Sequence, residues 1–101
     1  MVVRVFKVEG CVTCKGVIDE LSKLDIELIP VESTDPVNGK ICSDLDKIFE
    51  CNLYPKVVIE TSKNIVYIVP SQCKKIQQIA NNLFYYYTSI DNIVITVKQF
   101  I

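Results

Sequence analysis

Two periods of apolar residues run along this chain, and together they predict its elements. β-Branched and aromatic residues dominate residues 2–8, which is typical of a strand. Apolar residues then recur every three or four positions, which predicts a helix over residues 12–24. The apolar stripe of this helix consists of Val17, Ile18, Leu21 and Leu24. A second strand over 26–31 completes a β-α-β unit, whose two strands we expect to be parallel.

The pattern after residue 31 predicts a helix, a hairpin and a further helix. A loop over 32–40 is indicated by its Pro, Asn and Gly, and the pattern over 41–50 is that of a short helix. Two β-branched runs, 56–60 and 65–69, are separated by four residues, which predicts an antiparallel hairpin. Residues 72–87 are expected to form a third helix. Its inward positions would be Ile76, Ile79, Ala80, Leu83 and Phe84.

The tail over residues 90–101 fits two descriptions. Its β-branched run, 93–97, favours a strand, whereas its apolar residues also follow helical spacing. We favour the strand, which would lie at a sheet edge or pair with another subunit. The whole chain, 1–101, is thus expected to be a single α/β domain. It would contain a four-stranded mixed sheet flanked by helices and an extra C-terminal strand or helix.

Composition narrows the functional classes. The net charge is −1, and the charges are spread along the chain, so neither nucleic acid nor a membrane is an expected partner. The chain has no histidine, which excludes His-based triads and His metal ligands. Arg4 and Lys7 interrupt the first apolar run, so we expect no secretory signal, and no apolar run approaches bilayer length. A cytoplasmic, reducing location is the resulting expectation.

The strongest chemical signal is Cys11-Val12-Thr13-Cys14, between the first strand and the first helix. In a reducing compartment, two thiols three residues apart indicate redox or metal chemistry rather than a structural staple. Cys11 lies at the helix N-terminus, where the thiol pKa of CxxC motifs falls from about 8.5 to roughly 3.5–7.5. Cys11 is therefore the expected nucleophile and Cys14 the resolving thiol. Lys15 adds a positive charge nearby, and Thr13 can donate a hydroxyl hydrogen bond.

The other three cysteines carry weaker signals. Cys42 and Cys51 flank the second predicted helix and are expected to be core or half-buried thiols. Cys73 is expected to be structural, with a regulatory thiol as the alternative. A zinc site would show a second CxxC or a pair of histidines, and neither is present, so no metal site is expected. An iron–sulfur cluster shared between subunits and an inert pair of buried cysteines are the remaining alternatives for the CxxC.

With this element order, the Cys11–Cys14 motif and the run Tyr54-Pro55-Lys56-Val57-Val58-Ile59 together resemble the thioredoxin fold. Within that superfamily the chain is most similar to glutaredoxins and to the glutaredoxin-like hydrogen donors of ribonucleotide reductase. The resemblance covers about residues 2–85 and leaves 88–101 as a C-terminal extension. It implies that Pro55 is the family's cis-proline facing the active-site disulfide, although X–Pro bonds in general favour trans.

The resemblance implies a thiol–disulfide oxidoreductase that takes part in electron transfer and redox homeostasis. Its partners would be protein disulfides and a thiol reductant or reductase, with no permanently bound cofactor. Pro55 would shape the substrate groove, and the backbone of Tyr54 would pair with an extended substrate segment. The sequence leaves open whether the Cys11–Cys14 couple acts as a reductant or as an oxidant.

The chain departs from glutaredoxins where they bind glutathione. Ser71-Gln72 stand where the family has a pair of glycines, and Lys74-Lys75 stand where it has acidic residues. Without glycine the backbone approaches a peptide less closely, and a lysine repels the ligand's ammonium group. Glutathione, the alternative reductant, is therefore expected to bind poorly. The alternative function is a non-catalytic thioredoxin-fold binding module, with a homodimer as one form.

Overall fold

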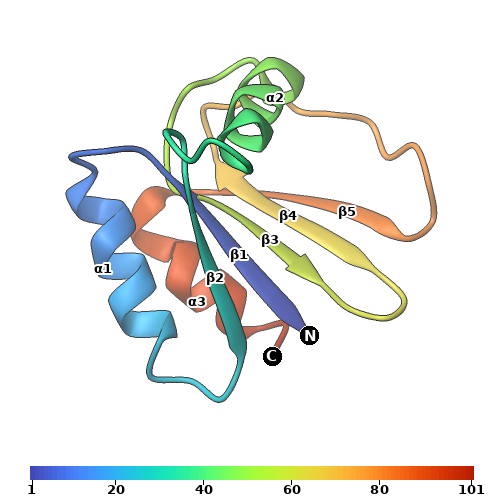
Figure 1. Ribbon diagram of the computed structural model, residues 1–101. Helices are drawn as coiled ribbons and strands as arrows, with labels where there is room; N and C mark the ends of the chain where they lie inside the picture. Colours follow the sequence, from blue (N-terminus) through green and yellow to red (C-terminus); the bar gives the residue numbers. More distant parts are fainter.

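Five strands form one mixed sheet in the computed structural model, which describes residues 1–101, and helices lie on both of its faces (Figure 1). In chain order the elements are β1 (Val2–Lys7), α1 (Val12–Leu21), β2 (Glu27–Glu32), α2 (Gly39–Phe49), β3 (Lys56–Glu60), β4 (Ile65–Pro70), β5 (Leu83–Thr88), the 3-10 helix η1 (Ile90–Asn92) and α3 (Ile93–Lys98). The α/β class expected from the sequence is confirmed.

The strands follow the order β2-β1-β3-β4-β5 across the sheet. Strands β1 and β2 are parallel, which confirms the predicted β-α-β unit, and β3 and β4 form the predicted antiparallel hairpin. The register pairs Phe6 of β1 with Lys56 of β3, and Val57 of β3 with Ile68 of β4. The end of β1, the start of β3 and the end of β4 therefore lie side by side at one end of the sheet.

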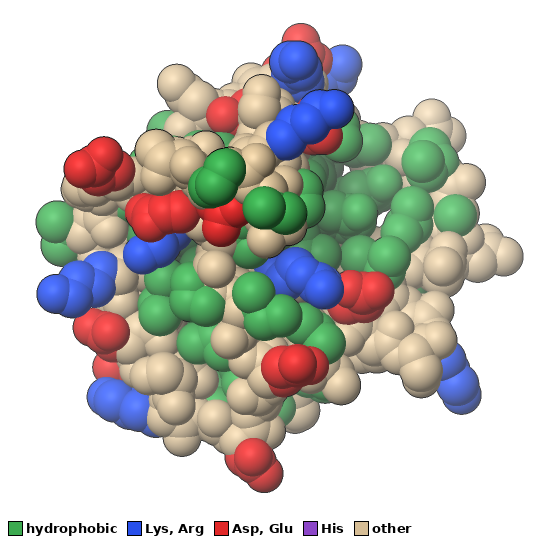
Figure 2. Space-filling model, viewed as in Figure 1, with side chains coloured by type: hydrophobic (Ala, Val, Ile, Leu, Met, Phe, Trp, Pro, Cys, Tyr) green, Lys and Arg blue, Asp and Glu red, His purple; other side chains and the backbone are tan.

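The two faces of the sheet carry separate apolar clusters. Val3 and Val5 of β1 point to the face covered by α1 and α3, where Ile93 and Val97 are fully buried. Phe6 points to the opposite face, which α2 covers. This alternation follows from the two-residue period of a strand. Figure 2 shows hydrophobic side chains gathered around a hollow on the α2 side of the sheet.

The prediction of a helix over 72–87 is wrong. Residues 71–82 form no helix or strand, and Leu83–Thr88 form β5, which pairs in parallel with β4. Aromatic residues favour strands, and their alternation decides the outcome here. Tyr85 and Tyr87 pack on the α2 side, whereas Phe84 packs against the cluster on the α1 and α3 side. The sheet therefore has five strands, not the predicted four.

The preference for a strand in the tail is also wrong. Residues 90–98 form η1 and α3, and the alternative pattern of helical spacing prevails. Helical spacing places Ile93 and Val97 on one face, and both are fully buried in the cluster that α1 shares. A strand would put Ile93 and Val94 on opposite faces, because its successive residues alternate, whereas the helix packs both against this cluster.

The other predicted elements are present, β3 with the predicted bounds and the rest with shifted ends. Helix α1 stops at Leu21 rather than residue 24, and β2 begins one residue later than expected. Helix α2 begins two residues earlier, and its C-cap residue Glu50 has a left-handed backbone with φ +48°. That turn reverses the chain after α2 and directs it back toward β3.

Candidate active site

Cys11 is the N-cap residue of α1, and its backbone is extended (φ −81°, ψ 97°). Its Sγ accepts a hydrogen bond from the backbone N–H of Cys14 at 3.1 Å. The first turn of the helix contains no acidic residue, so no carboxylate there offsets the positive end of the helix dipole. A thiolate at Cys11 would therefore be stabilised by a backbone donor and by the helix dipole.

The turn before Cys11 depends on Gly10. Its φ is +78°, in the left-handed region that glycine adopts at no steric cost. The N–H of Cys11 then donates to the carbonyl of Val8 at 3.3 Å. This tight turn carries the chain from the end of β1 to the start of α1 within a few residues and fixes where Cys11 lies.

The two cysteines form a disulfide with a Cα–Cα distance of 5.3 Å, and they differ in exposure. Cys14 is 0% exposed, whereas Cys11 is half-buried. An incoming reactant can therefore reach Cys11 more readily than Cys14. Thr13 and Lys15 are exposed on the first turn of α1, and Lys15 forms no ion pair.

The largest cavity of the protein, about 610 Å³, borders Cys11. It lies between the β1–α1 turn, the outer face of α1 and the end of β2. Its rim includes the Lys7–Glu32 ion pair (3.6 Å), and Val12 and Ile18 contribute apolar surface. A substrate segment that reaches Cys11 thus meets a partly apolar recess with charges of both signs at its edge.

Tyr54 and Pro55 lie at the same end of the sheet as the CxxC. The Tyr54–Pro55 peptide bond is cis, in agreement with the prediction. Pro55 directly precedes Lys56, which the register places opposite Phe6 near the end of β1. The side chains of Tyr54 and Cys14 belong to the same buried cluster. The structure therefore brings the proline turn and the cysteine motif to one end of the sheet.

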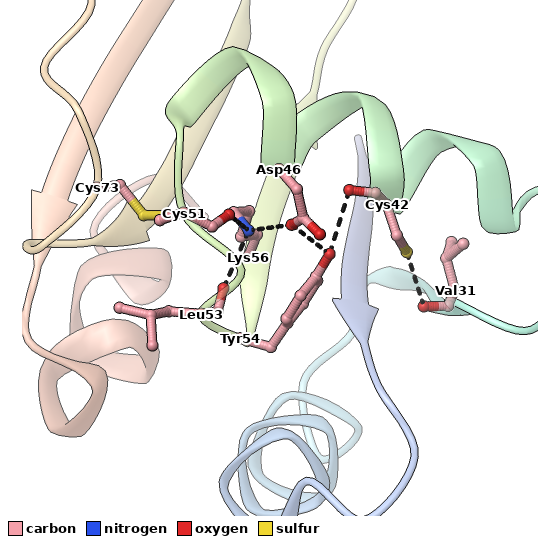
Figure 3. Close-up of polar contacts among 8 residues, drawn as sticks. All are labelled: Val31, Cys42, Asp46, Cys51, Leu53, Tyr54, Lys56 and Cys73. Atoms are coloured by element: carbon pink, nitrogen blue, oxygen red, sulfur yellow. Dashed lines mark hydrogen bonds and ion pairs between the residues drawn. A yellow bond between two sulfur atoms is a disulfide. The ribbon is translucent and has the colours of Figure 1, made fainter.

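A buried polar network fixes the loop that leads into this proline (Figure 3). Lys56 is 0% exposed, and its Nζ donates to Asp46 Oδ1 at 2.7 Å. It also donates to the carbonyls of Cys51 and Leu53, both at 3.0 Å. Asp46 in turn accepts from the Tyr54 hydroxyl at 2.5 Å. All three protons of the ammonium group have acceptors, so these hydrogen bonds and the Asp46 charge offset the cost of removing the ammonium group from water.

The sequence pattern does not reveal Lys56 and Asp46 as partners. They are ten residues apart, on different elements, and each looks like an ordinary surface charge in the sequence. The one available signal was a lysine beginning a strand whose next three residues are apolar. The Tyr54 phenol belongs to the same network. Burial and its hydrogen bond to Asp46 raise its pKa.

Cys51 and Cys73 form a second disulfide, which corrects the expectation that they are separate thiols. They are 22 residues apart, and no spacing motif connects them. The bridge ties the end of α2 to the segment after β4. Cys42 is the one free cysteine, and it is 1% exposed. Burial and the nearby Asp46 carboxylate raise the pKa of the Cys42 thiol, which makes it a poor nucleophile.

Aromatic rings fill the space between α2 and the last two strands. Phe49 of α2 lies with its ring centroid 6.0 Å from those of Tyr67 and Tyr85, and 6.4 Å from that of Tyr87. Tyr67 and Tyr85 are stacked at 5.3 Å with an interplanar angle of 23°. These contacts anchor α2 on β4 and β5, and they hold the end of the helix just before Cys51.

The structure contains no cluster of three or more side chains placed to ligate a metal ion. Its helices are too short or too polar for any of them to cross a bilayer. Comparison with family models, with curated proteins and with solved structures finds no match for this chain.

Proposed function

We propose that this chain is a thiol–disulfide oxidoreductase in which Cys11 and Cys14 exchange electrons with protein disulfides. One observation carries the proposal. A half-exposed Cys11 caps α1 and accepts the N–H of a fully buried Cys14, with which it forms a disulfide. A structural staple needs no such difference in access, whereas a nucleophile and a resolving thiol do.

The reaction proceeds in two exchanges. The Cys11 thiolate attacks one sulfur of the substrate disulfide, the substrate S–S bond breaks, and the released thiolate takes a proton from solvent. Cys14 then loses its proton and attacks the Cys11 sulfur of the mixed disulfide. The Cys11–Cys14 bond forms, and the second substrate thiol leaves. Two electrons pass to the substrate, and a thiol reductant or reductase restores the dithiol.

The proposal extends to the fold family. The cysteine motif follows the first strand, and a cis-proline precedes the third, as in the thioredoxin-like arrangement that the sequence resembles. In this assignment α3 takes the place of the helix that follows the hairpin, on the same face of the sheet as α1, and β5 is an addition to the basic pattern. In the segment after β4, Lys74 pairs with Glu50 and Lys75 is exposed without an acidic partner. The unpaired charge of Lys75 supports weak glutathione binding and a protein disulfide as the substrate.

Disulfide reductase activity of three proteins tests the proposal. Wild type should accelerate the reduction of insulin disulfides by dithiothreitol, and Cys11→Ser should abolish the acceleration. Cys14→Ser should instead accumulate a mixed disulfide on Cys11, because the resolving thiol is gone. Full activity in Cys11→Ser would show that the nucleophile is assigned wrongly.

The alternative is a non-catalytic binding module, and one feature favours it. Charged residues and proline commonly protect an edge strand from pairing with another chain. The edge strand β5 has neither. A module of this kind should form complexes that survive the joint replacement of Cys11 and Cys14 by serine. Loss of those complexes in the double variant would instead favour the oxidoreductase.

A further inference from the structure

The segment between β4 and β5 is attached to the end of α2 chiefly at one residue. Residues 71–82 form no helix or strand and arc outward beyond β5 (Figure 1). Cys73 is the only buried side chain in this segment, at 3% exposure. Ile79, by contrast, is 78% exposed despite its size. The other apolar contact is made by Ile76, which is partly buried against the α2-side cluster and donates its N–H to the Tyr87 hydroxyl of β5 at 2.7 Å.

Cys73 is held by contacts with the end of α2. Its disulfide with Cys51 is a covalent link to the residues that follow this helix. The next residue, Lys74, donates its N–H to the Phe49 carbonyl at 2.8 Å and pairs with Glu50 at 2.7 Å. The Lys74 and Glu50 side chains are 62% and 60% exposed, so this ion pair adds little to stability. The disulfide is thus the principal attachment of the segment to α2.

We propose that Cys51–Cys73 is a second redox site, which thiols open and which then releases residues 71–82 from the end of α2. Its reactants would be small thiols or dithiols, which can reach the half-buried Cys51. Cys51 is half-buried and Cys73 almost fully buried, so Cys51 is the residue that a thiolate can attack.

The chemistry balances with two equivalents of thiol. A thiolate attacks Cys51 Sγ and forms a mixed disulfide, the Cys51–Cys73 bond breaks, and the Cys73 thiolate takes a proton from solvent. A second thiolate attacks the outer sulfur of the mixed disulfide, which yields the external disulfide and the Cys51 thiolate. The external thiols supply both electrons. A disulfide of the same class closes the bridge by the reverse steps.

This site is separate from Cys11–Cys14, although both lie at the same end of the sheet. Cys11 follows β1, Cys51 precedes β3 and Cys73 follows β4, which are neighbouring strands. The Lys56 ammonium donates to the Cys51 carbonyl, so it holds the backbone of Cys51 and leaves Cys73 to move when the bridge opens. The proposal does not rest on the activity of the first pair.

Two double variants isolate the sites. Cys11→Ser/Cys14→Ser retains only the second bridge and Cys42, and Cys51→Ser/Cys73→Ser is the matched control without the bridge. Each native protein is equilibrated in dithiothreitol redox buffers, quenched in acid and alkylated, and the modified cysteines are located by peptide mass spectrometry. A second sample is cleaved briefly with trypsin, which cuts after Lys74 and Lys75.

In the first variant, Cys51 and Cys73 should become alkylated together in one reversible transition. Cleavage after Lys74 and Lys75 should rise about tenfold on reduction, because proteolysis follows the population of the released form. The control should be cleaved at the faster rate in every buffer. If the control does not fold, comparing cleavage of the first variant before and after reduction still shows whether opening the bridge releases the segment.

Two results would overturn the proposal. The bridge could open only in denaturant, even with excess dithiothreitol, or it could open without any change in cleavage. Because the variant used lacks Cys11 and Cys14, a failure here is distinct from a failure of the proposed oxidoreductase activity. That activity is measured on the wild-type chain.

Discussion

Individual side chains at one end of the sheet determine the candidate chemistry. Cys11 combines exposure with the start of a helix, whereas Cys14 is fully buried. Lys56 lies beneath the proline turn and binds one carboxylate and two carbonyls. The desolvation of this ammonium group is offset only while all three acceptors stay in place. Lys56 therefore fixes the backbone that leads into Pro55.

Replacing Lys56 by methionine should lower the free energy of unfolding by about 3 kcal/mol, the low end of the cost of breaking a buried ion pair. The low end applies because the Asp46 side chain is 32% exposed, and water can hydrate it once the lysine is gone. The carbonyls of Cys51 and Leu53 would also lose their donor. Urea unfolding monitored by circular dichroism measures the change.

Lys63→Met is the matched control for this substitution. Lys63 is exposed in the β3–β4 turn and forms no ion pair, so its replacement should change the stability by less than about 0.5 kcal/mol. Equal effects of the two substitutions would show that the Lys56 network adds nothing beyond the loss of a surface charge.

Stability should fall as the pH rises through the alkaline range. Burial is the first cause that raises the pKa values of Cys42, Tyr54 and Tyr67 in the folded protein. The unfolded chain loses these protons near the ordinary values, about 8.5 for Cys and about 10 for Tyr, while the folded chain keeps them. Above those values each group lowers the free energy of unfolding by up to about 1.4 kcal/mol per pH unit.

Unfolding curves between neutral and alkaline pH measure this slope. Tyr54→Phe removes one of the buried phenols and should flatten the dependence above about pH 10. Tyr86→Phe is the control, because Tyr86 is 42% exposed. A slope that changes as much in Tyr86→Phe as in Tyr54→Phe would contradict the assignment to buried groups.

At the scale of elements, two glycines on α1 and α2 differ sharply in their surroundings. A Cβ at Gly39, the first residue of α2, would lie 2.4 Å from the Ser33 carbonyl oxygen. A Cβ at Gly16, inside α1, would meet nothing within 4 Å. The start of α2 therefore packs directly on the backbone of the loop after β2, while that side of α1 is open.

Gly39→Ala should destabilise the protein by about 1–3 kcal/mol, the usual cost of overpacking, because the clash is with backbone. Gly16→Ala should stabilise it by about 0.4–1 kcal/mol, since alanine restricts the unfolded chain and fits the helix. Thermal unfolding of the two variants beside wild type gives the comparison. If both substitutions stabilised the protein, or both destabilised it, the packing described for α2 would be refuted.

The sequence predicted those elements whose own pattern was unambiguous. The strand and helix around Cys11 and the β3–β4 hairpin were found because local propensity and side-chain period agree there. The segment 72–87 failed because Ile76, Ile79 and Ala80 imitate a helix, while pairing of the following residues with β4 favours a strand. Only tertiary contacts decide between the two, and a local pattern does not contain them.

The candidate site was predictable to the same extent. The spacing of Cys11 and Cys14 is a local motif, and the run through Pro55 supported it. The Cys51–Cys73 bridge joins two loops 22 positions apart, and the Lys56–Asp46 pair joins residues ten positions apart on β3 and α2. Their contact is created by the order of β1, β3 and β4 in the sheet, which the sequence pattern does not specify.

At the scale of the whole molecule, the sheet gathers the chemistry at one end. The CxxC turn, the cis-proline loop and the second disulfide all adjoin the end of β1, the start of β3 and the end of β4. All five cysteines belong to, or pack against, the apolar cluster on the α2 side. Layers of helices on both faces hold this end in shape, while the β3–β4 turn lies at the opposite end.

The central claim is that Cys11 and Cys14 form a redox-active pair. The most direct test uses Cys51→Ser/Cys73→Ser, in which Cys42 is the only other thiol, equilibrated in glutathione redox buffers, quenched in acid and alkylated. Cys11 and Cys14 should be modified together in a single reversible two-electron transition, which Cys11→Ser removes. If both cysteines are modified in every buffer, or in none, the pair is not redox-active and the account is wrong.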